Sequence, residues 1–255
     1  MGMHPDKATC MNMLATAGTP EHVIKHCQAV ARTDYCIGWE INRARRENTG
    51  IGCHSCAPGA SAGRIIDLEL LVSAGLLHDM MRLYDDHAKI CSDILDGIGY
   101  REEANIIRTH MKYEKFNDLI MVNETDLLVL ADSLVIEDQM VGLDARAMYV
   151  VEKAKKLGRE DRISAILAKR DSARRLLTQI EQLTGKTIEQ IVEDGKQYIM
   201  VPRNWTTNCH KYSEHGIIKN ERKEQIPCHA EVITQLNSRP KSFLKYLRKR
   251  RSLAS

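Results

Sequence analysis

Aromatic residues are scarce in this sequence, since only 5% of its 255 positions are Phe, Trp or Tyr. Aromatic and β-branched side chains favour strands, whereas Leu, Ala and Met favour helices, so this shortage argues against a β-sandwich or a barrel. No apolar run approaches the roughly 20 residues that a membrane-spanning helix requires. The net charge of +3 is too small to predict a nucleic-acid-binding protein by itself.

A disulfide framework is also lacking, because the eight cysteines are scattered without a repeating pattern. No apolar stretch of the signal-peptide type follows Met1. We therefore expect a soluble, cytoplasmic protein whose cysteines are reduced and serve as packing residues or as ligands.

The periodicity of the apolar residues is helical, and no period-2 alternation is long enough to form a sheet. The predicted fold class is therefore all-α. Helices are expected at residues 19–31, 65–77, 86–95, 102–111, 124–135, 144–156 and 161–183, with a short helical turn at 187–192. They form one helical bundle at 19–195, between a loose N-terminal arm at 1–18 and a weakly ordered polar and basic extension at 196–255.

An adjacent His78–Asp79 pair ends the apolar helix predicted at 65–77, and Arg82 follows three residues beyond the aspartate. Ionisable groups at the buried end of a helix need a partner, and a metal ion is the commonest partner for a histidine with a carboxylate. The alternative is a helix-end pair that is salt-bridged to Arg82, at a high cost in buried charge. The metal interpretation requires further ligands from other helices.

Four residues on separate predicted helices can supply these ligands: His26, His87, His110 and Asp132. His26 lies on an apolar face of its helix, so we expect it to point inward. Imidazoles combined with carboxylates suit one or two divalent ions, with iron or manganese favoured and magnesium, cobalt, nickel or zinc also compatible. The alternative is that these four are ordinary core or surface residues.

In this order and setting, the residues resemble the ligands of the HD-domain metal-dependent phosphohydrolase superfamily. His26, in the setting His-Cys-x-x-Val-Ala, matches its first histidine, His78–Asp79 matches the namesake pair, and Asp132 matches the closing aspartate. His87 and His110 match the two additional histidines of the dinuclear branch, which includes bacterial diadenosine tetraphosphate hydrolases. The resemblance implies an HD-type helical domain over roughly residues 19–195.

The sequence departs from the family pattern at two positions. The usual His-Asp-Ile-Gly-Lys reads His-Asp-Met-Met-Arg at residues 78–82. Arg82 therefore stands in place of the family's phosphate-contacting lysine, and arginine can bind phosphate in a bidentate geometry. Met81 replaces a glycine, and we expect its side chain to narrow the pocket.

The resemblance implies an enzyme that cleaves a phosphomonoester, phosphodiester or phosphoanhydride bond of a nucleotide or another small phosphate compound. Asp79 and Arg82 are the expected catalytic residues. Asp79 would bridge two ions through its two oxygens, with an attacking water held between them. Arg82 would bind the substrate and steady the charge that develops on the phosphate. The alternative is a catalytically silent metal- or nucleotide-binding regulatory protein, in which Met81 and Arg82 block turnover.

A Gly-rich loop at residues 46–63 is longer than the family's usual connection. Its Cys53 and Cys56 have the spacing of half a zinc site, with Cys209–His210 and Cys228–His229 as the distant partners. The simpler interpretation is a lid over the pocket.

The C-terminal segment Lys241–Arg251 contains six Lys or Arg residues. It is either a solvated tail or a contact for nucleic acid, an anionic membrane surface or an acidic partner. A third class of function follows, in which a nucleic-acid-associated protein carries a degenerate metal site and its binding weakens steeply with salt. Formation of a homo-oligomer is left open.

Overall fold

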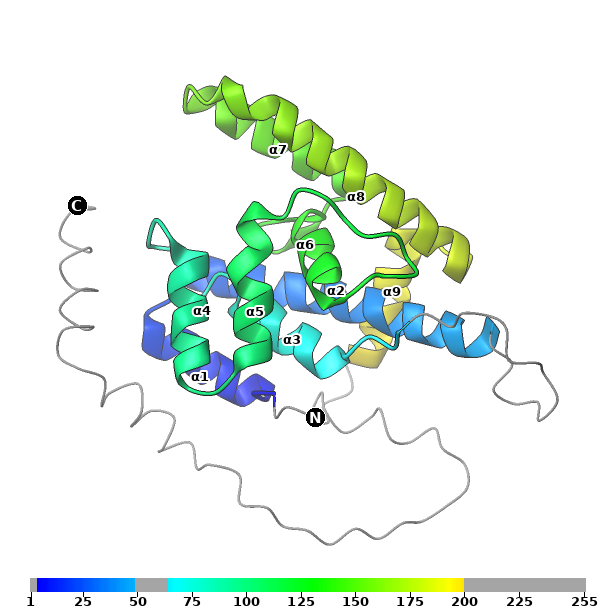
Figure 1. Ribbon diagram of the computed structural model, residues 1–255, viewed down its shortest axis with the longest axis horizontal. Helices are drawn as coiled ribbons and strands as arrows, with labels where there is room; N and C mark the ends of the chain where they lie inside the picture. Colours follow the sequence, from blue (N-terminus) through cyan, green and yellow to red (C-terminus); the bar gives the residue numbers. More distant parts are fainter. Residues whose placement is uncertain (1–3, 49–63, 200–255) are drawn as a thin grey trace, which may run out of the picture.

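The computed structural model describes residues 4–48 and 64–199. Within these ranges the regular secondary structure is helical apart from one small hairpin of two strands (Figure 1). The α-helices are α1 (Lys7–Ala17), α2 (Glu21–Asn48), α3 (Leu68–Leu77), α4 (His87–Gly97), α5 (Arg101–Thr109), α6 (Glu124–Asp132), α7 (Leu143–Lys156), α8 (Ile163–Thr184) and α9 (Ile188–Ile199). The short elements are the 3-10 helices η1 (His110–Lys112) and η2 (Glu160–Arg162) and the antiparallel strands β1 (Val135–Ile136) and β2 (Gln139–Met140). The all-α prediction is confirmed.

Several predictions concern segments outside the described residues. These are the loop cysteines with their distant zinc partners, the lid, and the basic run near the C-terminus. Within the described ranges, no helix is both long enough and apolar enough to cross a membrane. The four cysteines in these ranges, Cys10, Cys27, Cys36 and Cys91, are buried thiols.

Helix α2 is the central element of the fold. Its sequence was expected to be helical only as far as residue 31, but the helix has 28 residues and continues to Asn48. It packs against α3, α6, α8 and α9 and crosses the middle of the molecule (Figure 1). One helix therefore carries the candidate metal ligand His26 near its start and supports the core along its length.

Gly75 in α3 allows α2 and α3 to approach each other closely. A Cβ atom at this position would lie 2.7 Å from the Cα atom of Ala31 and 2.8 Å from Oδ2 of Asp34. Because Cα belongs to the backbone of α2, a larger residue at position 75 would push the two helices apart. This glycine therefore helps to fix the position of the His78–Asp79 pair that follows α3.

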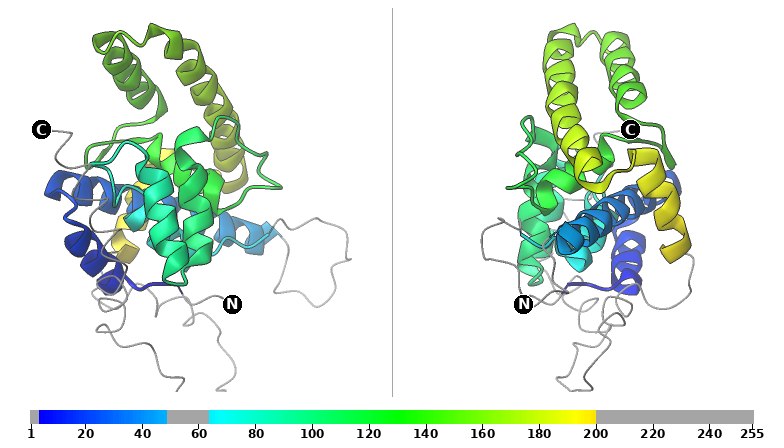
Figure 2. Two further views of the ribbon diagram at one scale, coloured as in Figure 1. Left: turned by 60° about the vertical axis from the view of Figure 1, so that its left-hand side comes forward. Right: turned by 90° about the vertical axis from the view of Figure 1, so that its right-hand side faces the viewer.

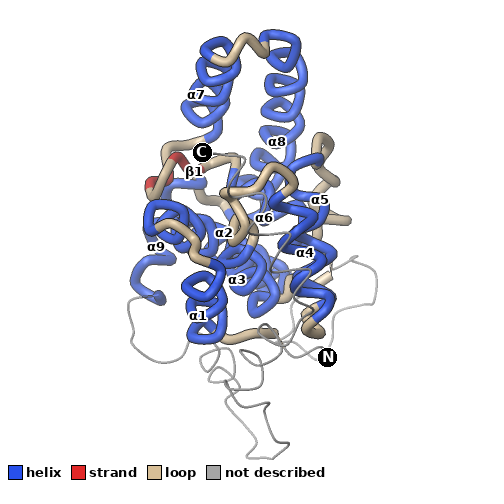
Figure 3. The backbone as a smooth tube through the Cα atoms, turned by 90° about the vertical axis from the view of Figure 1, so that its left-hand side faces the viewer, coloured by secondary structure: helices blue, strands red, loops and turns tan. Residues whose placement is uncertain are grey.

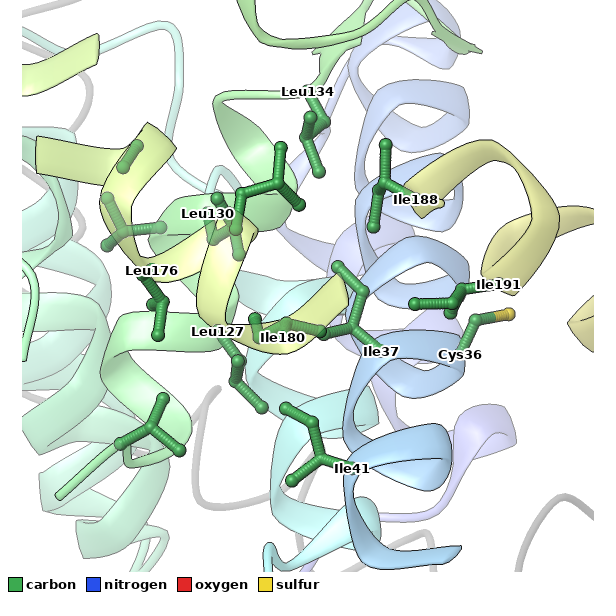
Figure 4. Packing of buried hydrophobic residues seen from close by; sticks show 14 of the residues in the cluster. Cys36, Ile37, Ile41, Leu127, Leu130, Leu134, Leu176, Ile180, Ile188 and Ile191 are labelled. Atoms are coloured by element: carbon green, nitrogen blue, oxygen red, sulfur yellow. The ribbon is translucent and has the colours of Figure 1, made fainter. Parts of the chain in front are cut away.

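The main hydrophobic core lies between α2, α6, α8 and α9 (Figure 4). Fully or nearly fully buried members of this core are Cys36, Ile37, Ile41, Leu127, Leu130, Leu134, Leu176, Ile180, Ile188 and Ile191. A second core joins α1, α3, α4 and α5, and a third, smaller cluster lies between α2, α3, α5 and α6. The predicted short turn at 187–192 is in fact the first half of α9, whose apolar residues complete the main core.

Helices α7 and α8 form a hairpin that extends away from the other helices (Figures 2 and 3). The C-terminal half of α8 carries Leu176 and Ile180 into the main core, which anchors the hairpin. Its start is anchored by Leu143 at the beginning of α7. The hairpin is thus held at its base, directly after the segment that contains Asp132.

The prediction of a loose N-terminal arm was wrong for residues 7–17, which form α1. Asp6 caps this helix by accepting a hydrogen bond from the Thr9 backbone nitrogen at 2.8 Å. Cys10, Met13 and Leu14 recur at helical spacing on one face and are buried in the second core. The helix is therefore held by this apolar stripe, although the segment is rich in small and polar residues.

His4 fastens the segment before α1 to three acidic residues. Its Nδ1 atom lies 2.7 Å from Oε1 of Glu103, and its Nε2 atom lies 3.4 Å from both Asp67 and Glu102. The His4 side chain is only 7% exposed. Hydrogen bonds with Asp67 and Glu103 raise the pKa of His4 to about 10, so the imidazole is charged at neutral pH.

We expect His4→Ala to lower the free energy of unfolding by about 2 kcal/mol at pH 6 and to have little effect at pH 10.5. The pKa of His4 rises from 6.5 to about 10 on folding, so its contribution is complete below pH 6.5 and is lost as the pH rises toward 10. Urea denaturation at the two pH values measures the difference. His22→Ala, at an exposed position of α2, is the control. An equal loss of stability at both pH values would show that packing, not charge, is responsible.

Candidate metal centre

The six residues predicted as metal ligands lie together where five helices meet. Four of them stand at helix ends, because His78 and Asp79 follow α3, His87 begins α4 and Asp132 ends α6. His110 follows α5 directly, and His26 lies in the second turn of α2. That they are ligands stays a prediction, but their convergence from distant parts of the sequence is what the metal interpretation requires.

Five of the six residues form two groups that share Asp79. One group is His26, His78 and Asp79, and the other is Asp79, His87 and His110. In each group the potential ligand atoms all lie within 4.8 Å of one another. Imidazole rings of neighbouring candidate residues also lie close together, with 5.4 Å between the ring centroids of His78 and His110. Each group has the size and donor types of a site for one metal ion.

Backbone carbonyls orient two of the imidazoles. Nδ1 of His78 lies 2.8 Å from the Gly75 carbonyl oxygen, and Nδ1 of His110 lies 2.7 Å from the Ile107 carbonyl oxygen. A carbonyl can only accept, so each Nδ1 donates, and in the neutral ring Nε2 then carries the lone pair. This arrangement is typical of histidines that bind metal through Nε2.

Three atoms at the centre of the cluster have no hydrogen-bond partner among the described residues. They are Nε2 of His78, Nε2 of His110 and Oδ1 of Asp79, and all three are buried. Burying such atoms without a partner costs free energy, so a native structure rarely leaves three of them in contact with one another. A cation bound in each of the two groups would satisfy all three atoms, and the side chains therefore fit metal ions.

Nε2 of His87 has two close neighbours, the Asp79 carboxylate and the Arg82 guanidinium. It lies 3.1 Å from Oδ1 of Asp79, while Nη1 of Arg82 lies 3.2 Å from the same nitrogen. A neutral imidazole nitrogen carries either one proton or one lone pair, so Nε2 either donates to Asp79 or accepts from Arg82, but does not do both. In the tautomer that accepts, His87 offers an electron pair to a cation, as Asp79 does.

His26 is oriented by an unusual residue in the β1–β2 turn. Nδ1 of His26 lies 2.8 Å from the carbonyl oxygen of Glu137, which has a φ angle of 52°. A left-handed conformation costs free energy for a residue with a side chain, and such strain is concentrated at functional sites. The turn thus places its carbonyl where it can fix the ring of His26.

Asp132 is beside the two groups rather than within them. Its Oδ1 lies 3.2 Å from Nε2 of His26 and 3.6 Å from Nη2 of Arg146. Burial opposes ionisation, but His26 and Arg146 hold the pKa of Asp132 well below its usual range. Burial likewise lowers the pKa of His26, yet the hydrogen bond with Asp132 leaves it raised overall. The proton between His26 and Asp132 is the one that a metal ion would replace.

The electrostatics of the cluster keep its central carboxylate ionised and its central imidazole neutral. Burial alone would raise the pKa of Asp79, but His78, His110, His87 and Arg82 together hold it well below the usual range. Burial lowers the pKa of His78 to about 4. At neutral pH both groups are therefore in the protonation states that metal ligands need.

The side chain of Met81, which was expected to narrow the pocket, is buried in a hydrophobic core. It is 3% exposed and belongs to the second core, packed with residues of α1, α4 and α5. The helix-end pair with Arg82 is present as well, since Nη1 of Arg82 lies 3.6 Å from Oδ1 of Asp79. Arg82 remains 40% exposed, so it borders the cluster and reaches solvent.

Two cations near Asp132 were not identified from the sequence. Arg146 lies in α7 and Lys169 in α8, and the sequence of each helix has an ordinary amphipathic pattern. Only the fold of the α7–α8 hairpin brings the two charges within electrostatic range of Asp132. Asp34 was also missed, although it is completely buried and neither carboxylate oxygen has a hydrogen-bond partner among the described residues. A lone aspartate within an apolar helix face was its only signal.

In comparisons with known proteins, the chain matches no family model, no curated protein and no solved structure. The functional argument therefore depends on the side chains of this cluster.

Proposed function

We propose that the chain is an HD-type metal-dependent phosphohydrolase, which cleaves a phosphate ester or phosphoanhydride bond of a nucleotide or another small phosphate compound. The observation that carries this proposal is the pair of His/Asp groups that share Asp79, with Arg82 beside them. The order of these residues along the chain, which resembles the HD-domain pattern, supports the same conclusion.

Each residue has a role that follows from its surroundings. Asp79, His78 and His110 direct electron-pair donors inward, and backbone carbonyls keep the two rings in that orientation. A divalent ion bound there supplies Lewis acidity and lowers the pKa of a water nucleophile. Arg82 has a guanidinium beside Asp79 and access to solvent, so it can hold a phosphate of the substrate against the cluster.

The proposal is tested on the full-length protein loaded with Mn²⁺ or Fe²⁺, by assaying nucleoside mono-, di- and triphosphates, dinucleoside polyphosphates and a generic phosphodiester. We expect metal-dependent release of phosphate or nucleotide. Retention of metal and nucleotide binding with no turnover on any of these substrates would favour the silent regulatory protein instead. A protein that binds no metal after reconstitution would refute both.

We expect Arg82→Met to lower kcat/KM for the best substrate about 10²- to 10³-fold, because an arginine that contacts the reacting phosphate stabilises its developing charge. Metal content should not change, since Arg82 is not a potential ligand. Arg82→Lys should recover part of the activity, as lysine keeps the charge but loses the bidentate geometry. Arg101→Met is the control, at a position whose side chain is 81% exposed at the start of α5. Unchanged kinetics in Arg82→Met would rule out a role in phosphate binding.

A further inference from the structure

The segment between α3 and α4 carries the His78–Asp79 pair and Arg82 but has no regular secondary structure. Residues 78–86 form a series of turns and a bend. The backbone hydrogen bonds within this segment join residues only three positions apart. Such local bonds shape each turn but do not attach the segment to the rest of the fold. Metal ligands need a fixed orientation, so contacts from other elements are required to supply it.

Thr19 makes a long-range contact of this kind. Its Oγ1 donates a hydrogen bond to the carbonyl oxygen of Met80 at 2.8 Å, and the two residues are 61 positions apart in the sequence. The bond is buried, and Thr19 is 8% exposed. A buried carbonyl is costly to leave without a donor, so this bond is not readily exchanged for water. It therefore fixes the backbone one residue beyond Asp79.

The end of α1 holds Thr19 in place. Gly18 follows the helix with a φ angle of 69°, a left-handed conformation that glycine adopts at little steric cost. The Gly18 nitrogen donates to the Ala15 carbonyl oxygen at 3.1 Å, and the Thr19 nitrogen donates to the Leu14 carbonyl oxygen at 3.0 Å. These two bonds form a Schellman motif. Thr19 is thus bound to α1 through its backbone and to Met80 through its side chain.

Cys91 in α4 makes a second contact with the same stretch of backbone. Its Sγ donates to the carbonyl oxygen of Leu77 at 3.2 Å, and the thiol is completely buried. Leu77 directly precedes His78, so the backbone is held on both sides of the His78–Asp79 pair. A thiol is a weak donor, whereas a hydroxyl is a strong one, so we expect the Thr19 contact to matter more.

We propose that Thr19 is a positioning residue of the metal centre, whose hydrogen bond to Met80 holds the Asp79 carboxylate where both His/Asp groups share it. The inference rests on the metal centre of the proposed function but does not require hydrolysis. Loss of a hydrogen bond that orients metal ligands typically lowers metal affinity 10- to 100-fold. Because Asp79 belongs to both groups, its displacement weakens both metal positions together.

Thr19→Val tests this role, since valine resembles threonine in shape but cannot donate a hydrogen bond. Thr19→Ala is a second variant without the hydroxyl, with no added methyl group to crowd the Met80 carbonyl. Thr19→Ser retains the donor. Thr184→Val is the matched control, because the Thr184 hydroxyl also donates to a backbone carbonyl, that of Ile180 at 2.9 Å, near the end of α8. Each full-length protein is titrated with Mn²⁺ well below its unfolding temperature, and free Mn²⁺ is followed by electron paramagnetic resonance.

We expect Thr19→Val and Thr19→Ala to bind Mn²⁺ about 10- to 100-fold more weakly at both positions. Thr19→Ser should recover most of the affinity, and Thr184→Val should bind as the wild type does. Circular dichroism of the apo proteins checks that all variants are folded during the titration. Wild-type affinity in both variants without the hydroxyl would overturn the proposal. So would a loss confined to one metal position, or an equal loss in Thr184→Val.

The positioning role and the hydrolase fail separately in this design. Weaker Mn²⁺ binding in Thr19→Val, with no hydrolysis by the wild type, would keep the positioning role and refute the hydrolase. Hydrolysis by the wild type, with unchanged Mn²⁺ affinity in Thr19→Val, would keep the hydrolase and refute the positioning role.

Discussion

Asp79→Ala is expected to abolish metal binding and to reduce hydrolysis by about a thousandfold or more. Asp79 is the one residue that belongs to both His/Asp groups in the described part of the chain. Without its carboxylate each group retains two imidazoles, which is too few ligands to hold a divalent ion tightly. Metal content by inductively coupled plasma mass spectrometry and turnover of the best substrate are the two measurements.

The apo form of Asp79→Ala should still fold. Burial lowers the pKa of His78 to about 4, so this neighbour is neutral at pH 7 and is not left as an uncompensated charge. Circular dichroism and the unfolding transition check that the loss of metal does not result from a loss of structure.

Asp34→Asn is the matched control for this experiment. Asp34 is as buried as Asp79, and burial raises its pKa well above the usual range, so its neutral form is closely mimicked by asparagine. This variant should keep its metal and its activity. If Asp79→Ala also retained both ions, Asp79 could not be the shared ligand, and the site would have to be rebuilt around other residues.

Most of the helices and several of the candidate ligands could be predicted from the sequence because each depends on a local pattern. An apolar helix that ends in His78–Asp79 is visible in ten residues, and His26 lies on an apolar face of its own helix. Such patterns show which side of a helix is buried. They do not show what that side contacts, so the convergence of five helices on one point had to come from the fold.

The features that sequence reasoning missed depend on contacts between distant segments. Helix α1 was overlooked because Cys10, Met13 and Leu14 are a short apolar stripe among small and polar residues. Glu137 has a left-handed backbone conformation, which glycine or asparagine usually adopts. Because a glutamate stands there instead, the sequence does not predict the turn. The sequence of α7 and α8 does not show that Arg146 forms an ion pair with Asp132, because only the fold of the hairpin brings the two together.

Removing a ligand from one group only should leave one ion bound. His26 belongs only to the first group and His87 only to the second, so His26→Ala and His87→Ala should each lower the metal content from two ions per chain to about one. Each ligand contributes strongly to affinity, and the weakened position should lose its ion at micromolar free metal. The combination of both substitutions should bind none.

Electron paramagnetic resonance of the Mn²⁺-loaded variants distinguishes a pair of ions from a single one. The wild type should give the broad spectrum of two coupled ions, and each single variant the spectrum of an isolated ion. Hydrolysis should fall about a hundredfold or more in both, because each substitution takes a ligand from one of the two groups that would together supply the Lewis acidity. His22→Ala is the control, since this histidine is exposed one turn before His26 on the same helix.

If either single substitution removed both ions, the two groups would be one cooperative site. If neither changed the stoichiometry, the assignment of His26 and His87 as ligands would be wrong.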